Sequence, residues 1–236
     1  FPQAENRMHL QKAILFDFGG TIDTNGVHWS EMFWSCYQRR HLRVAKPDFE
    51  KAFLKSEEML PRHADIATLD FRTLIGRQFR LQFDILGLPG AEQLAVSVGG
   101  ECYDEVASTV AHARTLLQAF RERYLLGVVS NFYGNLGIVC REFSLGEFFG
   151  VMVDSAVEGL RKPDPAIFSL ALGRLGVAGA DTYVVGDSYE RDIVPAKLLG
   201  CTTIWLKGKS WTTPKTTGAA DYTITTLDAM RAIVLP

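Results

Sequence analysis

The chain has 236 residues, of which 47% are hydrophobic, and it can therefore bury one large core or a core plus a smaller insert. Its 25 basic and 27 acidic residues give a formal net charge of −2, which argues against binding to nucleic acid or to an anionic membrane surface. The four cysteines lie far apart without a Cys-x-x-Cys pair, which argues against a zinc site and favours a reducing, cytoplasmic location.

The first predicted element is a short buried strand that ends at Asp17. Residues 14–17 read Ile-Leu-Phe-Asp, and the following Gly19-Gly20 pair would break a helix, so a strand and a tight loop explain this segment best. Open α/β sheets place their chemistry just beyond the carboxyl ends of the strands, which makes Asp17 a candidate reacting group. An aspartate near glycines is also ordinary in a turn, so this segment alone leaves both interpretations open.

A helical insert is predicted for residues 25–101, where the strand signals disappear. Apolar residues recur there at helical spacing in three runs, and a fourth helix is expected near 90–102. The first run carries an aromatic stripe made of Trp29, Phe33, Trp34 and Tyr37. Such a stripe more often packs against other helices than against a substrate, so we expect it to form the interior of the insert.

Strands and helices alternate in the rest of the chain. Helices are expected near 109–123, 134–142, 164–175 and 190–199, strands at 125–130, 150–154, 182–186, 201–206 and 222–224, and a short helix closes the chain. This alternation predicts an α/β fold with a Rossmann-like parallel sheet and helices on both faces. The core would comprise residues 8–24 and 102–236, with the insert as a helical cap domain.

Several later segments also place a polar residue at or near a strand end. Ser130-Asn131 follows one strand, Asp187 follows another, and Asp192 comes five residues later. Lys162 lies in the proline-stiffened segment Arg-Lys-Pro-Asp-Pro. Each has an ordinary explanation as a cap, a turn residue or a solvated charge. With Asp17, the residues Ser130, Lys162, Asp187 and Asp192 make five such coincidences in one chain, which is improbable, so a common site is the better interpretation.

The order of these motifs resembles the haloacid dehalogenase superfamily. That family has Asp-x-Asp-x-Thr first, then a Ser or Thr after a strand, a Lys, and Gly-Asp followed by a second acid. The most specific matches are Gly-Asp-Ser-Tyr-Glu-Arg-Asp at 186–192 and Lys-Pro-Asp-Pro at 162–165. The insert directly after the first motif resembles the helical cap of the first type. One departure stands out, because Gly19 occupies the place of the second aspartate of the family phosphatases.

A divalent cation is expected at this site. Asp17, Asp187, Asp192 and Lys162 together carry two surplus negative charges, too many to lie beside a phosphate without one. Magnesium fits because it takes oxygen ligands and usually keeps water and substrate phosphate in its shell. The resemblance implies that Asp17, the carbonyl oxygen of Gly19 and Asp187 are the metal ligands.

The resemblance also implies the remaining roles. Asp17 would be the nucleophile, Lys162 would balance charge on the phosphoryl oxygens, and Asp192 would position Lys162 or a metal-bound water. The predicted phosphate-binding residues are Gly20, Thr21, Ser130, Asn131 and Lys162. The function expected is that of a magnesium-dependent phosphohydrolase acting on a small phosphorylated metabolite through an aspartyl-phosphate.

Gly19 leaves the source of the catalytic proton open. Either the substrate has a leaving group that needs no proton, or another group such as Asp23 or His63 supplies it, or activity is weak or lost. A phosphonatase-like C–P hydrolase that uses Lys55 is an alternative, and so is a non-catalytic phosphate-binding or regulatory protein on the same scaffold. Nothing in the sequence indicates the oligomeric state.

Overall fold

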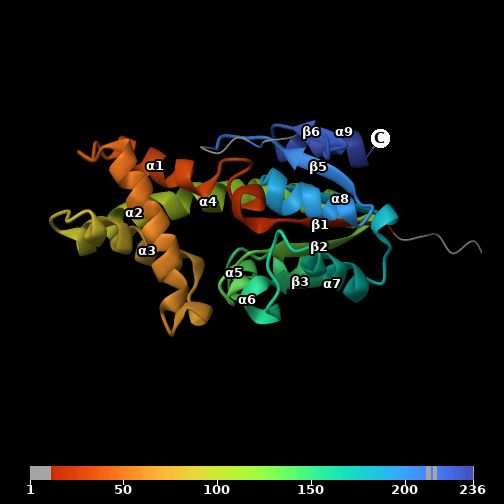
Figure 1. The fold of residues 1–236 in the computed structure, drawn as a ribbon, viewed down its shortest axis with the longest axis horizontal. Coiled ribbons are helices and arrows are strands. Elements are labelled where there is room, and N and C mark those ends of the chain that lie inside the picture. The colour runs from red at the N-terminus through yellow and green to blue at the C-terminus, as the bar shows by residue number, and fades with distance from the viewer. Residues whose placement is uncertain (1–11, 211–213, 215–216, 236) are drawn as a thin grey trace, which may run out of the picture.

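The computed structural model describes residues 12–210, 214 and 217–235, so residues 8–11 of the predicted core lie outside the described residues. Figure 1 shows a sheet flanked by helices, with a group of helices projecting beyond one end of it. None of the helices in the described part of the chain combines the length and the hydropathy that crossing a bilayer requires.

The core is built on one six-stranded parallel sheet, as predicted. Its strands are β1 (Lys12–Phe16), β2 (Tyr124–Ser130), β3 (Val151–Asp154), β4 (Thr182–Gly186), β5 (Thr202–Leu206) and β6 (Tyr222–Ile224), in the spatial order β3-β2-β1-β4-β5-β6. β1 pairs with β2 on one side and with β4 on the other, and Phe16 lies opposite both Val128 and Val185. The carboxyl ends of these three strands therefore lie side by side.

Helices cover both faces of the sheet, which confirms the predicted fold class. Ile14 and Phe16 of β1 pack in the same cluster as α4 (Ala91–Arg121), α5 (Leu136–Glu142) and α9 (Arg231–Val234). Leu15 between them faces the other way, towards α7 (Ala166–Leu175) and α8 (Val194–Leu198). Alternate side chains of a strand point to opposite faces, so a strand covered on both faces reads as a continuous apolar run.

The insert is helical, as its periodicity predicts. It contains α1 (Trp29–Arg39), α2 (Lys46–Met59) and α3 (Phe71–Ile85), with short 3₁₀ turns at Leu60–Arg62 and Ile66–Thr68. Two residues of the aromatic stripe pack inside it: Phe33 contacts Phe79 at 4.3 Å between ring centroids, and Tyr37 contacts Phe49 at 4.9 Å. These two side chains are interior residues of the insert, as expected. Trp29 and Trp34 are half-buried, and the Trp29 indole donates to Asp23 in the loop after β1.

The prediction of two separate helices near 90–102 and 109–123 is wrong. Residues 91–121 form the single 31-residue helix α4, which Figure 1 shows running from the insert into the core. Gly99-Gly100 looks like a break in the sequence, but a β-carbon on Gly99 would lie 3.0 Å from the α-carbon of Gly76 in α3. The glycine therefore permits close packing of two helices. The predicted domain boundary at residues 101/102 falls inside α4.

Candidate active site

Three strand ends and one loop bring the predicted residues together. The Lys162 ammonium lies 2.6 Å from Oδ1 of Asp17 and 2.6 Å from Oδ1 of Asp192. The Ser130 hydroxyl lies 3.3 Å from the same oxygen of Asp17. Asp17 follows β1, Ser130 ends β2, and Asp192 lies just beyond β4, so the sheet order explains why residues distant in sequence meet.

Lys162 is held at this point from several directions. The residue is 4% exposed, and Nζ also donates to the carbonyl oxygen of Val129 at 3.1 Å. Its backbone N–H donates to the side chain of Asn131, which in turn donates to the Lys162 carbonyl. Burial by itself lowers the pKa of Lys162, but Asp17 and Asp192 outweigh this effect and raise the pKa above its ordinary value. The ammonium is therefore charged and fixed between two carboxylates.

Asn131 was predicted to bind phosphate, and its side chain amide is engaged with the Lys162 main chain instead. Its observed contacts are those of a residue that positions the lysine loop. The same loop contains a cis peptide bond between Lys162 and Pro163.

Asp17, Asp187 and Asp192 form an acidic cluster. One carboxylate oxygen from each lies within 4.8 Å of the others. Burial raises the pKa of Asp187 well above its ordinary value, and the nearby charges of Asp17 and Asp192 add to this effect. No hydrogen bond or ion pair holds the Asp187 side chain within the described residues, whereas Lys162 bonds to both of the other aspartates.

The loop after β1 completes this cluster. It forms one wide turn over Phe18–Ile22. The Thr21 hydroxyl donates to Oδ2 of Asp17 at 3.3 Å and accepts the backbone N–H of Asp187 at 3.1 Å. Thr21 therefore links the segments that follow β1 and β4. The predicted donor Gly20 N–H is engaged within the loop, where it donates to Oδ1 of Asp23 at 2.7 Å.

Asp23, which the sequence offered as one possible source of the catalytic proton, also lies in this loop region. It is fully buried, and its second oxygen accepts the indole N–H of Trp29 at 2.9 Å. Burial raises the pKa of Asp23 to about 8, although the hydrogen bonds from Gly20 and Trp29 lower it in part. In the sequence, Asp23 is marked only as a second aspartate six residues after Asp17; the structure shows that it lies in a run of buried residues.

The insert contacts the loop that follows β2. The Tyr133 hydroxyl lies 3.3 Å from Oε1 of Glu57 in α2, and Gln78 in α3 also donates to that oxygen. Desolvation raises the pKa of Glu57, and the nearby Arg161 lowers it in part. Arg161 is the neighbour of Lys162 in the chain. The insert therefore reaches the segments that carry Ser130 and Lys162.

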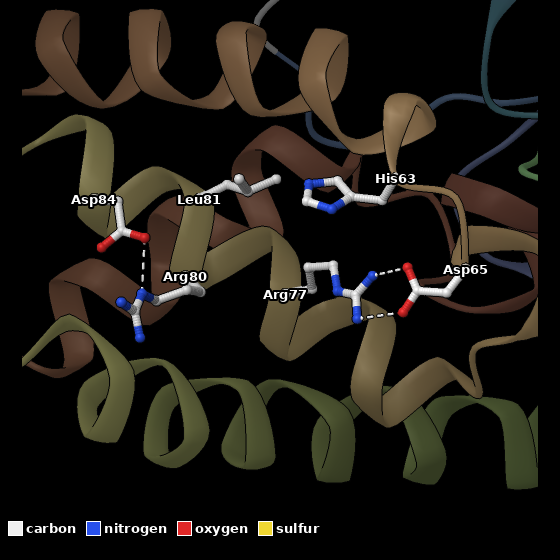
Figure 2. A pocket seen from close by; sticks show the side chains of 6 residues that line it. All are labelled: His63, Asp65, Arg77, Arg80, Leu81 and Asp84. Atoms are coloured by element: carbon white, nitrogen blue, oxygen red, sulfur yellow. Dashed lines mark hydrogen bonds and ion pairs between the residues drawn. The ribbon is translucent and has the colours of Figure 1, made fainter.

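A hollow of about 480 Å³ in the insert is separate from this site. Figure 2 shows its lining side chains, which all come from the insert: His63, Asp65, Arg77, Arg80, Leu81 and Asp84. Arg77 pairs with Asp65 and Arg80 with Asp84, so its charges are matched internally. His63 lines this hollow, and among the described residues no hydrogen bond or ion pair joins it to the acidic cluster, so the structure gives no support to His63 as the replacement for the missing acid.

Lys55, the residue considered for a phosphonatase, lies on the exposed side of α2. Its ammonium pairs with Glu58 at 2.9 Å, and both side chains are about half exposed. No contact between Lys55 and the carboxylate site is observed among the described residues, and the structure gives no support to an imine at this lysine.

The acidic cluster has the donor chemistry of a magnesium site. Magnesium prefers carboxylate, carbonyl and water oxygens, and Asp17 and Asp187 offer two carboxylates beside each other. The raised pKa of Asp187 is the expected result when such carboxylates meet without a cation. The residues present therefore fit the ion.

Comparison with known proteins decides the family. A model of the haloacid dehalogenase-like hydrolases matches residues 11–200. The chain belongs to this family. Within the haloacid dehalogenase-like hydrolases, it is 31% identical over 205 residues to a protein of Pyrococcus furiosus named glyceraldehyde 3-phosphate phosphatase. The aligned residues cover 85% of this chain and 82% of that protein. It is therefore an enzyme of the hydrolase type.

Solved structures of haloacid dehalogenase-like hydrolases share the fold. A phosphatase from Thermococcus onnurineus superposes with a TM-score of 0.56 at 25% identity, covering 94% of this chain and 97% of that chain. The hydrolase YfnB from Bacillus subtilis, whose crystal structure contains magnesium, superposes with a TM-score of 0.60 at 16% identity, covering 96% of this chain and all of that chain.

Proposed function

We propose that this haloacid dehalogenase-like hydrolase is a magnesium-dependent phosphohydrolase that acts on a small phosphorylated metabolite. The observation that carries the proposal is the surroundings of Asp17, whose Oδ1 accepts from both Lys162 and Ser130 and whose carboxylate lies beside that of Asp187. The phosphatase name of the Pyrococcus furiosus relative supports a phosphate ester as the substrate class.

In the first step, Asp17 attacks phosphorus, and the bond between phosphorus and the ester oxygen breaks. The product is an aspartyl-phosphate, and the leaving alkoxide takes up a proton. Lys162 and the Ser130 hydroxyl stabilise the charge on the phosphoryl oxygens, because both already lie within hydrogen-bonding distance of the attacking carboxylate. When bound, magnesium would neutralise part of the negative charge of the carboxylates and the phosphate.

In the second step, water attacks the phosphorus of the aspartyl-phosphate. The bond from phosphorus to the Asp17 oxygen breaks, inorganic phosphate leaves, and the carboxylate is restored. Asp192 acts through Lys162, which it holds in place with an ion pair of 2.6 Å. Gly20 and Thr21 shape the loop that carries Asp17, and their proposed contacts with phosphate involve the main chain of this loop.

A cytoplasmic location is part of the proposal. All four cysteines are free thiols in the structure, and each is buried. Free buried thiols are typical of proteins that fold in a reducing compartment.

The test is phosphate release from a panel of alkyl phosphates, acyl phosphates and phosphonates in the presence of magnesium. We expect turnover of at least one small phosphate ester and a transient gain of one phosphoryl group on the rapidly quenched protein, detected by mass spectrometry. Asp17→Asn should remove both signals, because an amide is a poor nucleophile. Asp48→Asn, a change at an exposed acid of α2, is the matched control and should keep both.

Two outcomes would contradict the proposal. Turnover that survives in Asp17→Asn would rule out the aspartyl-phosphate. Tight binding of inorganic phosphate without turnover of any ester would indicate a phosphate-binding protein.

A further inference from the structure

Gly19 leaves room for a β-carbon in the nucleophile loop, in van der Waals contact with Trp29 and Asp23. Its backbone angles, φ −75° and ψ 117°, are those that any L-residue adopts, so a side chain would fit the main chain here. A β-carbon at this position would meet no backbone atom closely, and its nearest neighbours would be Nε1 of Trp29 at 3.6 Å and Oδ2 of Asp23 at 4.0 Å. A side chain at residue 19 would therefore point towards the Trp29 indole and the carboxyl group of Asp23.

The turn explains how a residue four positions later reaches this place. The chain winds through Phe18–Ile22, and the backbone N–H of Asp23 returns to the carbonyl of Phe18 at 3.3 Å. The Asp23 side chain then lies under Gly19, with one oxygen on the Gly20 N–H and the other on the Trp29 indole. The loop thus contains a second carboxyl group after all, delivered from a different position.

We infer that Asp23 supplies the proton that the leaving group takes up when the phosphate ester is cleaved. The inference rests on the proposed phosphohydrolase function. In the first step the O–H bond of the Asp23 carboxyl breaks, a new O–H bond forms on the ester oxygen, and the bond from that oxygen to phosphorus breaks. In the second step the carboxylate of Asp23 takes a proton from the attacking water, which restores both carboxyl groups.

Two further observations agree with this role. The raised pKa of Asp23, about 8, means that the carboxyl keeps its proton at neutral pH, as a general acid must. Within the described residues, the hydrogen bond that reaches Oδ2 comes from the indole of Trp29, the first residue of α1 in the insert. The Gly20 N–H holds Oδ1, so two hydrogen bonds keep the carboxyl in its place beside Gly19.

The competing explanation is that Asp23 only fixes the loop. A structural tie would affect every substrate alike, whereas a general acid matters most for a leaving group that needs protonation. The experiment therefore compares glycerol phosphate, whose alkoxide leaves poorly, with p-nitrophenyl phosphate, whose phenolate leaves without a proton. Both are assayed with magnesium, and thermal melting reports the fold of each variant.

Asp23→Asn should lower kcat/KM for glycerol phosphate by about 10²- to 10⁴-fold and for p-nitrophenyl phosphate by less than about tenfold. Adding Gly19→Asp to Asp23→Asn should raise kcat/KM for glycerol phosphate by at least about tenfold, because it returns a carboxyl group to the region beside residue 19. Trp29→Phe is the matched control, since it removes the hydrogen bond from the indole to Oδ2 of Asp23 and keeps the Asp23 carboxyl. It should not change the ratio of the two rates.

Equal losses on the two esters in Asp23→Asn, or no loss on glycerol phosphate, would overturn the inference and leave the proposed function intact. Failure of Gly19→Asp to rescue a folded Asp23→Asn protein would also overturn it. A wild-type protein that releases phosphate from neither ester nor from the wider panel would overturn the proposed function, and this inference with it.

Discussion

The carboxylate of Asp187 lies against the α-carbon of Gly20, in the space that a side chain at residue 20 would fill. A β-carbon there would come within 2.5 Å of Cγ of Asp187, and Gly20 has a φ of +92°. Gly186 makes room for Asp192 in the same way, since a β-carbon on Gly186 would lie 2.5 Å from Cβ of Asp192. The acidic cluster can assemble because two glycines let its side chains approach the main chain.

Gly20→Ala should therefore destabilise the protein and abolish phosphate release. We expect a loss of more than about 1 kcal/mol in the free energy of unfolding, because alanine disfavours a positive φ and its methyl group displaces Asp187. Urea unfolding measures the stability. Gly137→Ala is the control: Gly137 lies in α5 with nothing near its β-position, and helix propensity predicts a gain of about 0.5–1 kcal/mol. Similar stability changes in both variants would contradict this account.

Lys162→Met should cost about 3–5 kcal/mol of stability in metal-free protein, because it leaves Asp17 and Asp192 buried without their cation. Lys197→Met removes an ion pair of the same length, 2.6 Å, but one whose side chains are 43% and 33% exposed. That loss should stay within about 1 kcal/mol. Urea unfolding in EDTA compares the two variants. Equal losses would show that burial does not determine how much the Lys162 ion pairs contribute to the free energy of unfolding.

The sequence predicted well which edge of the sheet carries the candidate site, because strand ends are local features. The apolar runs before Asp17, Ser130 and Asp187 each became a parallel strand, and the order of the strands alone brings their ends together. Lys162 joins them through contacts that also involve Val129 and Asn131. The glycine pair before Glu101 misled the helix prediction, since its reason is contact between α3 and α4.

The role of Asp23 could not be read from the motif. Its neighbours in space, Gly20 and Trp29, are set by a wide turn whose backbone angles no short pattern specifies. The contact of Glu57 with Tyr133 depends on how the insert packs on the core, which is a long-range property. Local patterns identify which groups lie at strand ends, while tertiary packing decides which other groups join them.

Magnesium should stabilise the wild-type protein and not Asp187→Asn. Binding to the folded state alone adds about 2.7 kcal/mol when the free ion is at 100 times its Kd. Asp187 lies beside Asp17, and within the described residues its side chain makes no ion pair with Lys162, so its loss should remove most of this gain. Urea unfolding with magnesium and with EDTA measures the difference, and Asp48→Asn is the control that should respond like wild type. A full magnesium response in Asp187→Asn would place the ion elsewhere.

The last prediction concerns the pH dependence of stability in metal-free protein. The pKa of Asp23 rises from 3.8 to about 8 on folding, so the folded state holds this proton more tightly than the unfolded state. Its contribution to stability is complete below about pH 4 and is lost as the pH rises to about 8, with a slope that approaches 1.4 kcal/mol per pH unit. Asn does not titrate.

Between pH 5 and pH 8, wild type should therefore lose a few kcal/mol of unfolding free energy relative to Asp23→Asn. Urea unfolding in EDTA at several pH values measures it. Asp187 and Asp192 titrate in both proteins, so the difference reports Asp23 together with its effect on the pKa of Asp187. Asp221→Asn is the control. Partial burial of Asp221 is outweighed by hydrogen bonds from Lys197 and Thr203, which bring its pKa below 3.8 and outside this range. A constant difference for Asp23→Asn would mean that Asp23 is already ionised in the folded protein at pH 5, and it could not then serve as the acid.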